Sequence, residues 1–315
     1  MIKDANVIFT FTIKIFFTTI MFLSILNAEL FDYKIVPSSL GGRNYMNVKI
    51  LDSKEIRFGK SGGVAFSEIS DLAYKDNKLF TLGDKGVLYE LNINLRNDKI
   101  NELDLTNATP LKAQNDQKLD KVHRDAEGLA FMGENLLVSF EREHRIDLYS
   151  LNAKKIKNIK INKRLENKDD YQSENKGLEA VAYNEKYGVL TAPEAPLKSK
   201  ITHTIYSQRA KWKFKADGVI KALEFIDENN LLVLIRDSNK ATKKMITVLV
   251  RVNLEKCQKD KCESDLLTKM DETDGWNIYN FEGLCKVGEN RFLMISDDDE
   301  DFSQKTILTL FEITN

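Results

Sequence analysis

Several features that mark common classes of protein are scarce in this chain of 315 residues. The formal net charge is −1, with 47 basic and 48 acidic side chains, so no overall positive field would attract nucleic acid. Four prolines and no tract rich in glycine and serine argue against a flexible linker. After residue 28 no stretch approaches the roughly 20 apolar residues that a membrane-spanning helix needs. These absences predict one domain over residues 29–315, without a membrane span of its own and without a nucleic-acid partner.

Cysteine and histidine are equally rare, with three of each. Cys257 and Cys262 enclose a short polar segment without the two-residue spacing of a metal or redox pair, so in an oxidising compartment we expect a disulfide. Cys285 lies in an apolar run and is expected to be a small buried residue rather than a nucleophile. No GxSxG motif occurs and no serine has an evident histidine partner, which argues against a Ser-His-Asp esterase. Among the histidines only His123, close to Asp125, is a candidate acid.

The first 28 residues have the pattern of a secretory signal. Lys3 and Lys14 precede an apolar run, residues 15–26, which ends in Asn27 and Ala28, and cleavage is expected after Ala28. Leu26 is an unusual residue three positions before that point, which leaves an uncleaved anchor as the alternative. The mature protein is therefore expected in the periplasm or outside the cell.

What the chain does contain is a repeated unit of two short apolar strands joined by a turn. The first strand has a small residue near its start, the turn is rich in Asn, Asp, Gly or Glu, and the second strand is mostly apolar. Runs this short predict β-hairpins rather than helices. The copies span residues 67–84, 125–141, 177–194, 219–236 and 281–297.

Two positions of the unit are polar in every copy. They lie 14 or 15 residues apart each time, which is the strongest regularity in the sequence. We call the first of them the first ring; it consists of Ser70, Glu127, Glu179, Lys221 and Glu282. The second ring consists of Asp84, Glu141, Glu194, Arg236 and Asp297.

A unit that returns after 57, 52, 42 and 61 residues, with about four short strands each time, is typical of a β-propeller. Five visible copies and a degenerate one in residues 31–66 predict an all-β fold of six blades, each a four-stranded antiparallel sheet, with five or seven blades as alternatives. The strand at 306–313 is expected to close the propeller by pairing with the N-terminal region. The polar insertions at 100–121, 154–175 and 256–277 are expected to be surface loops.

Equivalent residues of propeller blades lie around one axis, so the two rings are expected to gather carboxylates at one mouth of the channel. Such carboxylates repel one another and their pKa values rise unless a cation neutralises them. Oxygen donors without histidine favour Ca²⁺ over Zn²⁺. The candidate metal ligands are Asp84, Glu127, Glu141, Glu179, Glu194, Glu282 and Asp297.

Cationic side chains lie next to the same positions and could bind phosphate oxygens. The candidates for substrate binding are Arg124, Arg142, Lys176 and Arg236, with Lys85 and Lys221 nearby. The chemistry that this predicts is metal-assisted hydrolysis of a phosphate ester, in which a ring glutamate takes a proton from water. The candidate catalytic residues are Glu127, Glu179 and Glu282.

The same segments carry a resemblance to a known family. The runs 125–130, 139–142, 175–179, 280–284 and 296–298 resemble the signatures of the phytase-like family described as "esterase-like activity of phytase", and the similarity extends from about Ser67 to the C-terminus. This resemblance implies a β-propeller, export and a phosphoesterase-like activity that depends on conserved Glu and Asp positions.

One copy departs from the pattern, because it has Lys221 and Arg236 where other copies have acids, and another has Ser70. The rings are therefore mixed in charge, which favours an anionic ligand. Two alternatives stay open at this point: a non-catalytic propeller whose channel Ca²⁺ ion is structural and whose face binds a protein or glycan, and a lactonase-like esterase. The protein is expected to be a monomer, with a small molecule or phosphate ester as its substrate.

Overall fold

The computed structural model describes residues 26–40, 44–58, 64–299 and 304–314. Residues 1–25 of the expected signal segment therefore lie outside the described residues. Within the described part of the chain, no helix is both long and apolar enough to span a lipid bilayer.

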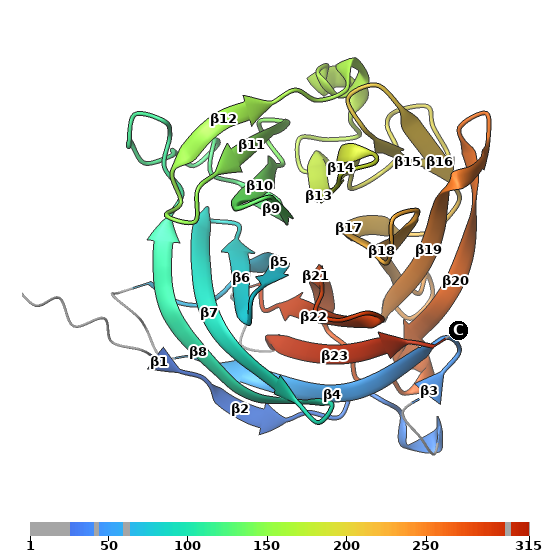
Figure 1. The fold of residues 1–315 in the computed structure, drawn as a ribbon. Helices are drawn as coiled ribbons and strands as arrows, with labels where there is room; N and C mark the ends of the chain where they lie inside the picture. Colours follow the sequence, from blue (N-terminus) through green and yellow to red (C-terminus); the bar gives the residue numbers. More distant parts are fainter. Residues whose placement is uncertain (1–25, 41–43, 59–63, 300–303, 315) are drawn as a thin grey trace, which may run out of the picture.

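The innermost strands of the protein form a closed ring around a central axis (Figure 1). Each inner strand contacts the next one along the chain, and the last contacts the first. Because a ring of five inner strands closes on itself, the described strands form a five-bladed β-propeller. The inner strands are β5 (Ile69–Lys75), β9 (Ala126–Met132), β13 (Leu178–Asn184), β17 (Val219–Phe225) and β21 (Asn280–Lys286).

Each blade is an antiparallel sheet that runs outward from its inner strand. Blade 1 continues with β6 (Lys78–Gly83), β7 (Val87–Arg96) and β8 (Lys99–Pro110), and β1 (Leu26–Asn27) pairs with β8. Blade 2 continues with β10 (Asn135–Phe140), β11 (Arg145–Tyr149) and β12 (Lys155–Ile159). Blade 3 continues with β14 (Gly188–Pro193), β15 (His203–Tyr206) and β16 (Lys211–Phe214). Blade 4 continues with β18 (Asn230–Ser238), β19 (Met245–Gln258) and β20 (Lys261–Asp271).

Blade 5 joins the two ends of the chain. From β21 it continues with β22 (Arg291–Asp297) and β23 (Ile307–Ile313), and its fourth strand is β4 (Val48–Arg57) from the N-terminal region. Two short strands, β2 (Glu29–Asp32) and β3 (Asn44–Tyr45), pair with the other edge of β4. The remaining elements are the 3-10 turns η1 (Ser38–Leu40), η2 (Lys163–Leu165), η3 (Lys168–Asp170) and η4 (Glu272–Asp274).

This closure corrects the expected number of blades. The described part of residues 31–66 does not build a sixth blade, because its one long strand, β4, completes the sheet begun by β21, β22 and β23. The pairing of the C-terminal strand with the N-terminal region is confirmed, with Ile313 opposite Val48 and Ile307 opposite Glu55.

The hydrophobic core is divided among the interfaces between neighbouring blades. Side chains of a strand alternate between its two faces, and both faces of a blade are covered by another blade, so neighbouring positions must both be apolar. In β10, Leu136 and Val138 pack toward blade 1, whereas Leu137 packs toward blade 3. Comparable clusters fill the interfaces between blades 3 and 4, blades 4 and 5, and blades 5 and 1. Cys285 is buried in the last of these, as expected.

Two of the three polar insertions, 100–121 and 256–277, are strands for half or more of their length, whereas 154–175 is mostly a loop after β12, as expected. Residues 99–110 form β8, and most of 256–271 lies in β19 and β20. They are polar because outer strands have a solvent-exposed face. The expected disulfide between Cys257 and Cys262 is present near the tip of the β19–β20 hairpin. That tip is attached to blade 3, where the N–H of Lys213 donates to Asp260 at 2.6 Å.

Candidate functional site

A β-bulge places each residue of the first ring. In all five inner hairpins the pairing register shifts at the first-ring position, for example between Leu178 and Ala180, which leaves Glu179 outside the regular ladder. A bulge re-aims a side chain that would otherwise follow the alternation into the core. The polar residue of each copy can therefore leave the apolar interface and turn toward the axis.

The second ring lies where the second strand of each hairpin ends. In the first three blades the backbone N–H of the second-ring residue donates to a carbonyl just before the inner strand, as Glu141 does to Asp125 at 3.0 Å. Arg236 and Asp297 pair directly with Val219 and Asn280 in the ladder. This pairing brings each second-ring residue back beside its first-ring counterpart.

Blade 4 supplies a buried cation to this cluster. The ammonium of Lys221 lies 2.9 Å from Glu282 Oε1 and 3.5 Å from Glu194 Oε1, and it also contacts Glu179. Burial by itself lowers the pKa of Lys221, but these three carboxylates together raise it well above its usual range. Lys221 is therefore a charged ammonium that joins the inner strands of blades 3, 4 and 5.

Arg236, the second cation of blade 4, binds the same carboxylates from the second ring. Its guanidinium lies 3.0 Å from Glu282 Oε1 and 3.3 Å from Glu194 Oε1, and it donates to Asn280 Oδ1 at 2.6 Å. Lys176 also pairs with Glu194. Glu179, Glu194 and Glu282 are thus compensated by cations of the chain itself.

Two carboxylates of blade 2 form no such ion pair, although Lys221 acts on both from a greater distance. Glu127 and Glu141 are each 9% exposed, and neither side chain has a hydrogen bond or ion pair with any other described residue. Burial raises the pKa of Glu127 well above its usual range, and Glu179 and Asp84 add to the effect. Burial, with Asp125 and Glu194 nearby, raises the pKa of Glu141 to about 7.

The remaining two ring acids also pair with no cation of the described residues. Asp84 accepts a hydrogen bond from Ser70 Oγ at 2.6 Å, and burial raises its pKa to about 7. Asp297 accepts a hydrogen bond from the backbone N–H of Asp299 at 3.1 Å, and burial raises its pKa far above the usual value. Glu127, Glu141, Asp84 and Asp297 are therefore the ring acids that pair with no cation of the described residues, and we call this group the acidic side of the mouth.

Three of the predicted metal ligands have the geometry of a cation site. One carboxylate oxygen of each of Glu141, Glu179 and Glu194 lies within 4.8 Å of the others, and all three residues are buried. Oxygen atoms that bind Ca²⁺ at 2.3–2.6 Å can be separated by this much. The donor set contains only carboxylates, which fits a hard divalent ion, and Glu141 is the member that has no other partner.

Two of the four predicted phosphate-binding cations, Lys176 and Arg236, form ion pairs with ring carboxylates. Arg142 pairs with Asp125, with 2.5 Å between Nε and Oδ2. Lys85, the lysine next to Asp84, pairs with Glu68 at 2.5 Å. Arg124 differs from them, because its side chain has no hydrogen bond or ion pair among the described residues and it lines a pocket beside the rings.

Two buried polar residues of this region were not predicted from the sequence as site residues. Asn280 donates to Glu282 Oε1 at 3.0 Å and so orients a ring carboxylate. Asp71 is fully buried next to the bulge of Ser70 and accepts backbone N–H groups from Leu129 at 2.8 Å and Leu284 at 3.0 Å. The sequence feature that could have identified both residues is their position next to a ring residue in the repeat.

His123 lies outside the rings. Its ring nitrogen is 2.8 Å from the Asp120 carboxylate, and both side chains are largely exposed. This contact gives His123 a partner in a surface turn rather than a place among the buried carboxylates.

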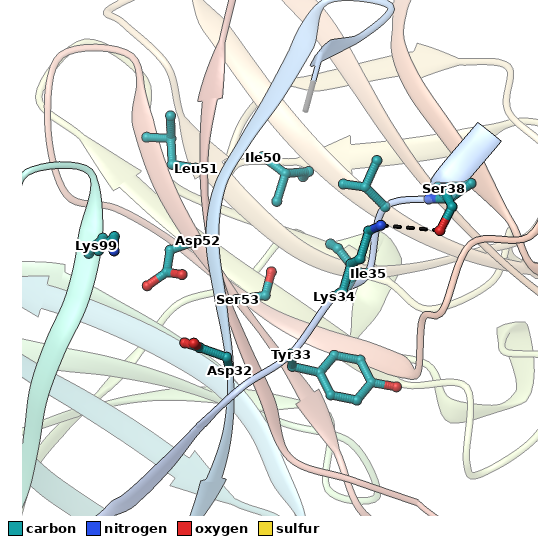
Figure 2. Close-up of a pocket in the computed structure, with 12 residues that line it drawn as sticks. Asp32, Tyr33, Lys34, Ile35, Ser38, Ile50, Leu51, Asp52, Ser53 and Lys99 are labelled. Carbon is teal, nitrogen blue, oxygen red and sulfur yellow. Dashed lines mark hydrogen bonds between the residues drawn. The ribbon is translucent and has the colours of Figure 1, made fainter. Parts of the chain in front are cut away.

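A separate pocket lies on the outer rim of the propeller, away from the rings. Figure 2 shows it between the segment Asp32–Ser38 and strand β4, with Lys99 on its far side. Its acids are compensated, because Lys54 pairs with Asp32 and lies 3.6 Å from Asp52. Its lining contains no ring residue.

The fold and the site together define a β-propeller with a buried, carboxylate-rich channel mouth. The chain belongs to the phytase-like family described as "Esterase-like activity of phytase", whose model matches residues 64–300, about three quarters of the sequence. No curated protein matches it.

Solved structures that resemble the chain share little sequence with it. Glutaminyl cyclase from Myxococcus xanthus is 12% identical with a TM-score of 0.46, over 79% of this chain and 92% of that one. The PQQ-bound aldose sugar dehydrogenase from Streptomyces coelicolor is 9% identical with a TM-score of 0.44, over 85% and 99%. The Cps50 (Swd1) β-propeller domain from Myceliophteria thermophila is 10% identical with a TM-score of 0.42, over 92% and 100%. The assignment rests on the family match and not on these structures.

Proposed function

We propose that this protein is an exported, metal-dependent hydrolase of phosphate esters whose active site lies at the channel mouth, where the acidic side meets Glu179 and Glu194. The observation that carries the proposal is the pair Glu127 and Glu141, two buried carboxylates without a partner beside further acids. Buried charges are normally paired or bound to a metal, because leaving them uncompensated costs several kcal/mol. A divalent cation would relieve this cost.

Glu141, Glu179 and Glu194 are the residues that would hold the ion, and their oxygen donors favour Ca²⁺. When bound, such an ion supplies electrophilic polarisation of phosphoryl oxygens and lowers the pKa of a bound water. Lys221 keeps Glu179 and Glu194 in place and limits how much negative charge the site carries. Replacing Glu141 would remove the one of these three ligands whose side chain has no hydrogen bond or ion pair with another described residue.

Glu127 is the best-placed general base of the three that the sequence suggested, because Glu179 and Glu282 are held by Lys221. Glu127 would take a proton from water as the water oxygen bonds to phosphorus and the phosphorus–oxygen bond to the alcohol breaks. The alcohol oxygen would then take a proton from solvent while Glu127 releases its proton to solvent, which completes hydrolysis to alcohol and phosphate. Arg124 would bind phosphate oxygens, since it is the one of the four predicted cations whose side chain has no hydrogen bond or ion pair among the described residues.

The test combines metal dependence with a matched pair of variants. Protein stripped of metal is assayed on phosphomonoester, phosphodiester and carboxyl-ester chromogenic substrates with and without Ca²⁺, beside Glu127→Gln and the exposed control Glu289→Gln. Turnover of a phosphate ester that requires Ca²⁺, and that falls at least 100-fold in Glu127→Gln only, supports the proposal. Turnover of the carboxyl ester alone would favour a lactonase-like esterase.

A second function is favoured by Lys221 itself. An ammonium fixed among three ring carboxylates already neutralises part of the mouth, as expected for a propeller that binds a ligand without catalysis. If Ca²⁺ raises the melting temperature and no substrate of any class turns over, this binding function replaces the first.

Export is part of the same proposal. It is supported by the basic and apolar pattern of residues 1–28 and by the disulfide between Cys257 and Cys262, which forms in oxidising compartments. N-terminal sequencing of protein from an exported fraction should begin at Glu29. A chain that stays in the reducing compartment with its first residues intact would contradict it.

A further inference from the structure

A pocket of about 410 Å³ opens beside the rings between blade 1 and the segment that leads into blade 2. One part of its wall is aliphatic and is formed by Val87, Pro110, Leu111 and Leu119. The volume is within the range of sites that bind small organic molecules. The pocket can therefore hold a compact apolar group.

Cations dominate the polar part of the same wall. Lys85, Lys118 and Arg124 line the pocket, against a single acid, Glu68, which Lys85 engages at 2.5 Å. The side chains of Lys118 and Arg124 have no hydrogen bond or ion pair among the described residues. Two positive charges are thus available to an anion at the edge of an apolar pocket.

The cations lie where the pocket meets the rings. Lys85 directly follows the ring residue Asp84, and Arg124 directly precedes Asp125. The two segments are in close contact, because a Cβ added at Gly86, which has a φ of +66°, would lie 2.8 Å from the Arg124 carbonyl oxygen. The backbone of Arg124 therefore lies against the turn that follows the ring residue Asp84, and its side chain lines the pocket at this edge.

We infer that this pocket binds the organic group of the substrate, and that the substrate class is a phosphate ester of a compact apolar alcohol of roughly phenyl or naphthyl size. This inference rests on the proposed function, since it assigns the substrate of the same site. A polyol that carries many phosphates does not fit the wall, because its polar groups would be buried against Val87, Pro110 and Leu119 without partners.

The test measures binding separately from turnover. Affinities of 1-naphthyl phosphate, methyl phosphate and inositol hexakisphosphate are measured by calorimetry in the presence of Ca²⁺ on the Glu127→Gln protein, in which hydrolysis is suppressed. We expect 1-naphthyl phosphate to bind at least tenfold more tightly than methyl phosphate. Equal affinities for these two, or tightest binding of the hexakisphosphate, would overturn the inference.

Variants separate the two halves of the pocket. In the same background, Arg124→Gln should weaken both monoesters about tenfold, whereas Leu119→Asn should weaken only 1-naphthyl phosphate, by about fivefold or more. Arg209→Gln, which removes an exposed cation elsewhere, should change neither. Val87→Thr provides a second, volume-conserving change if Leu119→Asn lowers the melting temperature. Unchanged selectivity in both apolar variants would contradict the assignment.

The proposed function and this inference can fail independently. If the wild-type protein binds 1-naphthyl phosphate through Arg124 and Leu119 but hydrolyses nothing, the pocket is assigned correctly and the hydrolase is not. If the wild-type protein hydrolyses methyl phosphate with the same kcat/KM as 1-naphthyl phosphate, the hydrolase stands and the pocket assignment is wrong.

Discussion

The ammonium of Lys221 lies 2.9 Å from a carboxylate oxygen of Glu282, and this ion pair joins the inner strands of blades 4 and 5 at a point where both residues are buried. Lys221 also contacts Glu179 of blade 3. One side chain therefore connects three of the five blades at the mouth of the channel, and it does so from a ring position that other copies of the repeat fill with an acid or a serine.

Replacing Lys221 with methionine should destabilise the protein strongly. Removal of one partner of a buried ion pair costs roughly 3–5 kcal/mol, because the remaining carboxylates stay buried without a counter-charge. The free energy of unfolding in urea, measured with a chelator present, reports this loss. Added Ca²⁺ should restore part of it, since the freed carboxylates can then bind the ion. Lys186→Met, which removes an exposed lysine, is the control, and an equal loss in both variants would contradict the central role of Lys221.

Without metal, stability should fall as the pH rises from about 4 to 7. The pKa values of Glu141 and Asp84 are raised to about 7 from 4.5 and 3.8, so the folded protein binds more protons than the unfolded chain in this range. Stability contributed by the protonated forms is complete below the unfolded values and is lost as the pH passes the folded ones. Each unit of pKa shift corresponds to about 1.4 kcal/mol. Urea titrations at pH 5 and pH 8 in a chelator measure the difference.

The same carboxylates predict how Ca²⁺ and protons compete. Ca²⁺ should raise the melting temperature by several degrees at pH 8 and much less at pH 5, where Glu141 is protonated. Glu141→Gln should flatten the pH dependence in chelator and also reduce the effect of Ca²⁺ at pH 8. A melting temperature that responds equally to Ca²⁺ at both pH values would show that the ion binds elsewhere.

Asp71→Ala should destabilise the closed ring of blades. The carboxylate accepts N–H groups from its own strand and from the inner strands of blades 2 and 5, and each buried donor left without an acceptor costs roughly 1–3 kcal/mol. We expect a loss of at least about 3 kcal/mol in the free energy of unfolding. Asp71→Asn should lose less unfolding free energy, since the amide oxygen can still accept a hydrogen bond from some of these three N–H groups. A smaller loss in the alanine variant than in the asparagine variant would contradict this role.

Reduction of the Cys257–Cys262 disulfide should have a modest effect. The bridge closes a short loop, for which loop-closure entropy predicts about 2 kcal/mol. The double Cys→Ser variant should therefore remain folded, with a melting temperature lower by a few degrees. Limited proteolysis should cut first at the β19–β20 tip, because the contact of Asp260 with Lys213 depends on the shape of that turn. Unchanged proteolysis at the tip would show that the hairpin holds its position without the bridge.

The repeat predicted most of the architecture and the two rings, because local patterns carry that information. Five hairpins with a polar residue at the same two positions are visible without knowledge of pairing between distant segments. The bulge explains why the first-ring residue interrupts an otherwise apolar strand, as Glu179 does between Leu178 and Ala180.

The number of blades could not be read from the same patterns. Strand β4 has the alternation of any outer strand, and only its long-range pairing with β23 shows that it completes blade 5. The sequence also could not predict which ring carboxylates are paired with a cation. It gives the mixed composition of the rings but not the distances from Lys221 to its three carboxylates. The role of Asp71 depends on backbone N–H groups of two other blades, and no sequence motif predicts these contacts.

The closure of blade 5 also determines when its strands can pair during synthesis of the chain. One edge of β4 has no partner until β23 has been synthesised, and the start of β23 lies 250 positions after the end of β4. At 5–20 residues per second this edge remains open for roughly 12–50 seconds. During that interval the nascent chain presents an unpaired strand edge, which is a site where another polypeptide can pair.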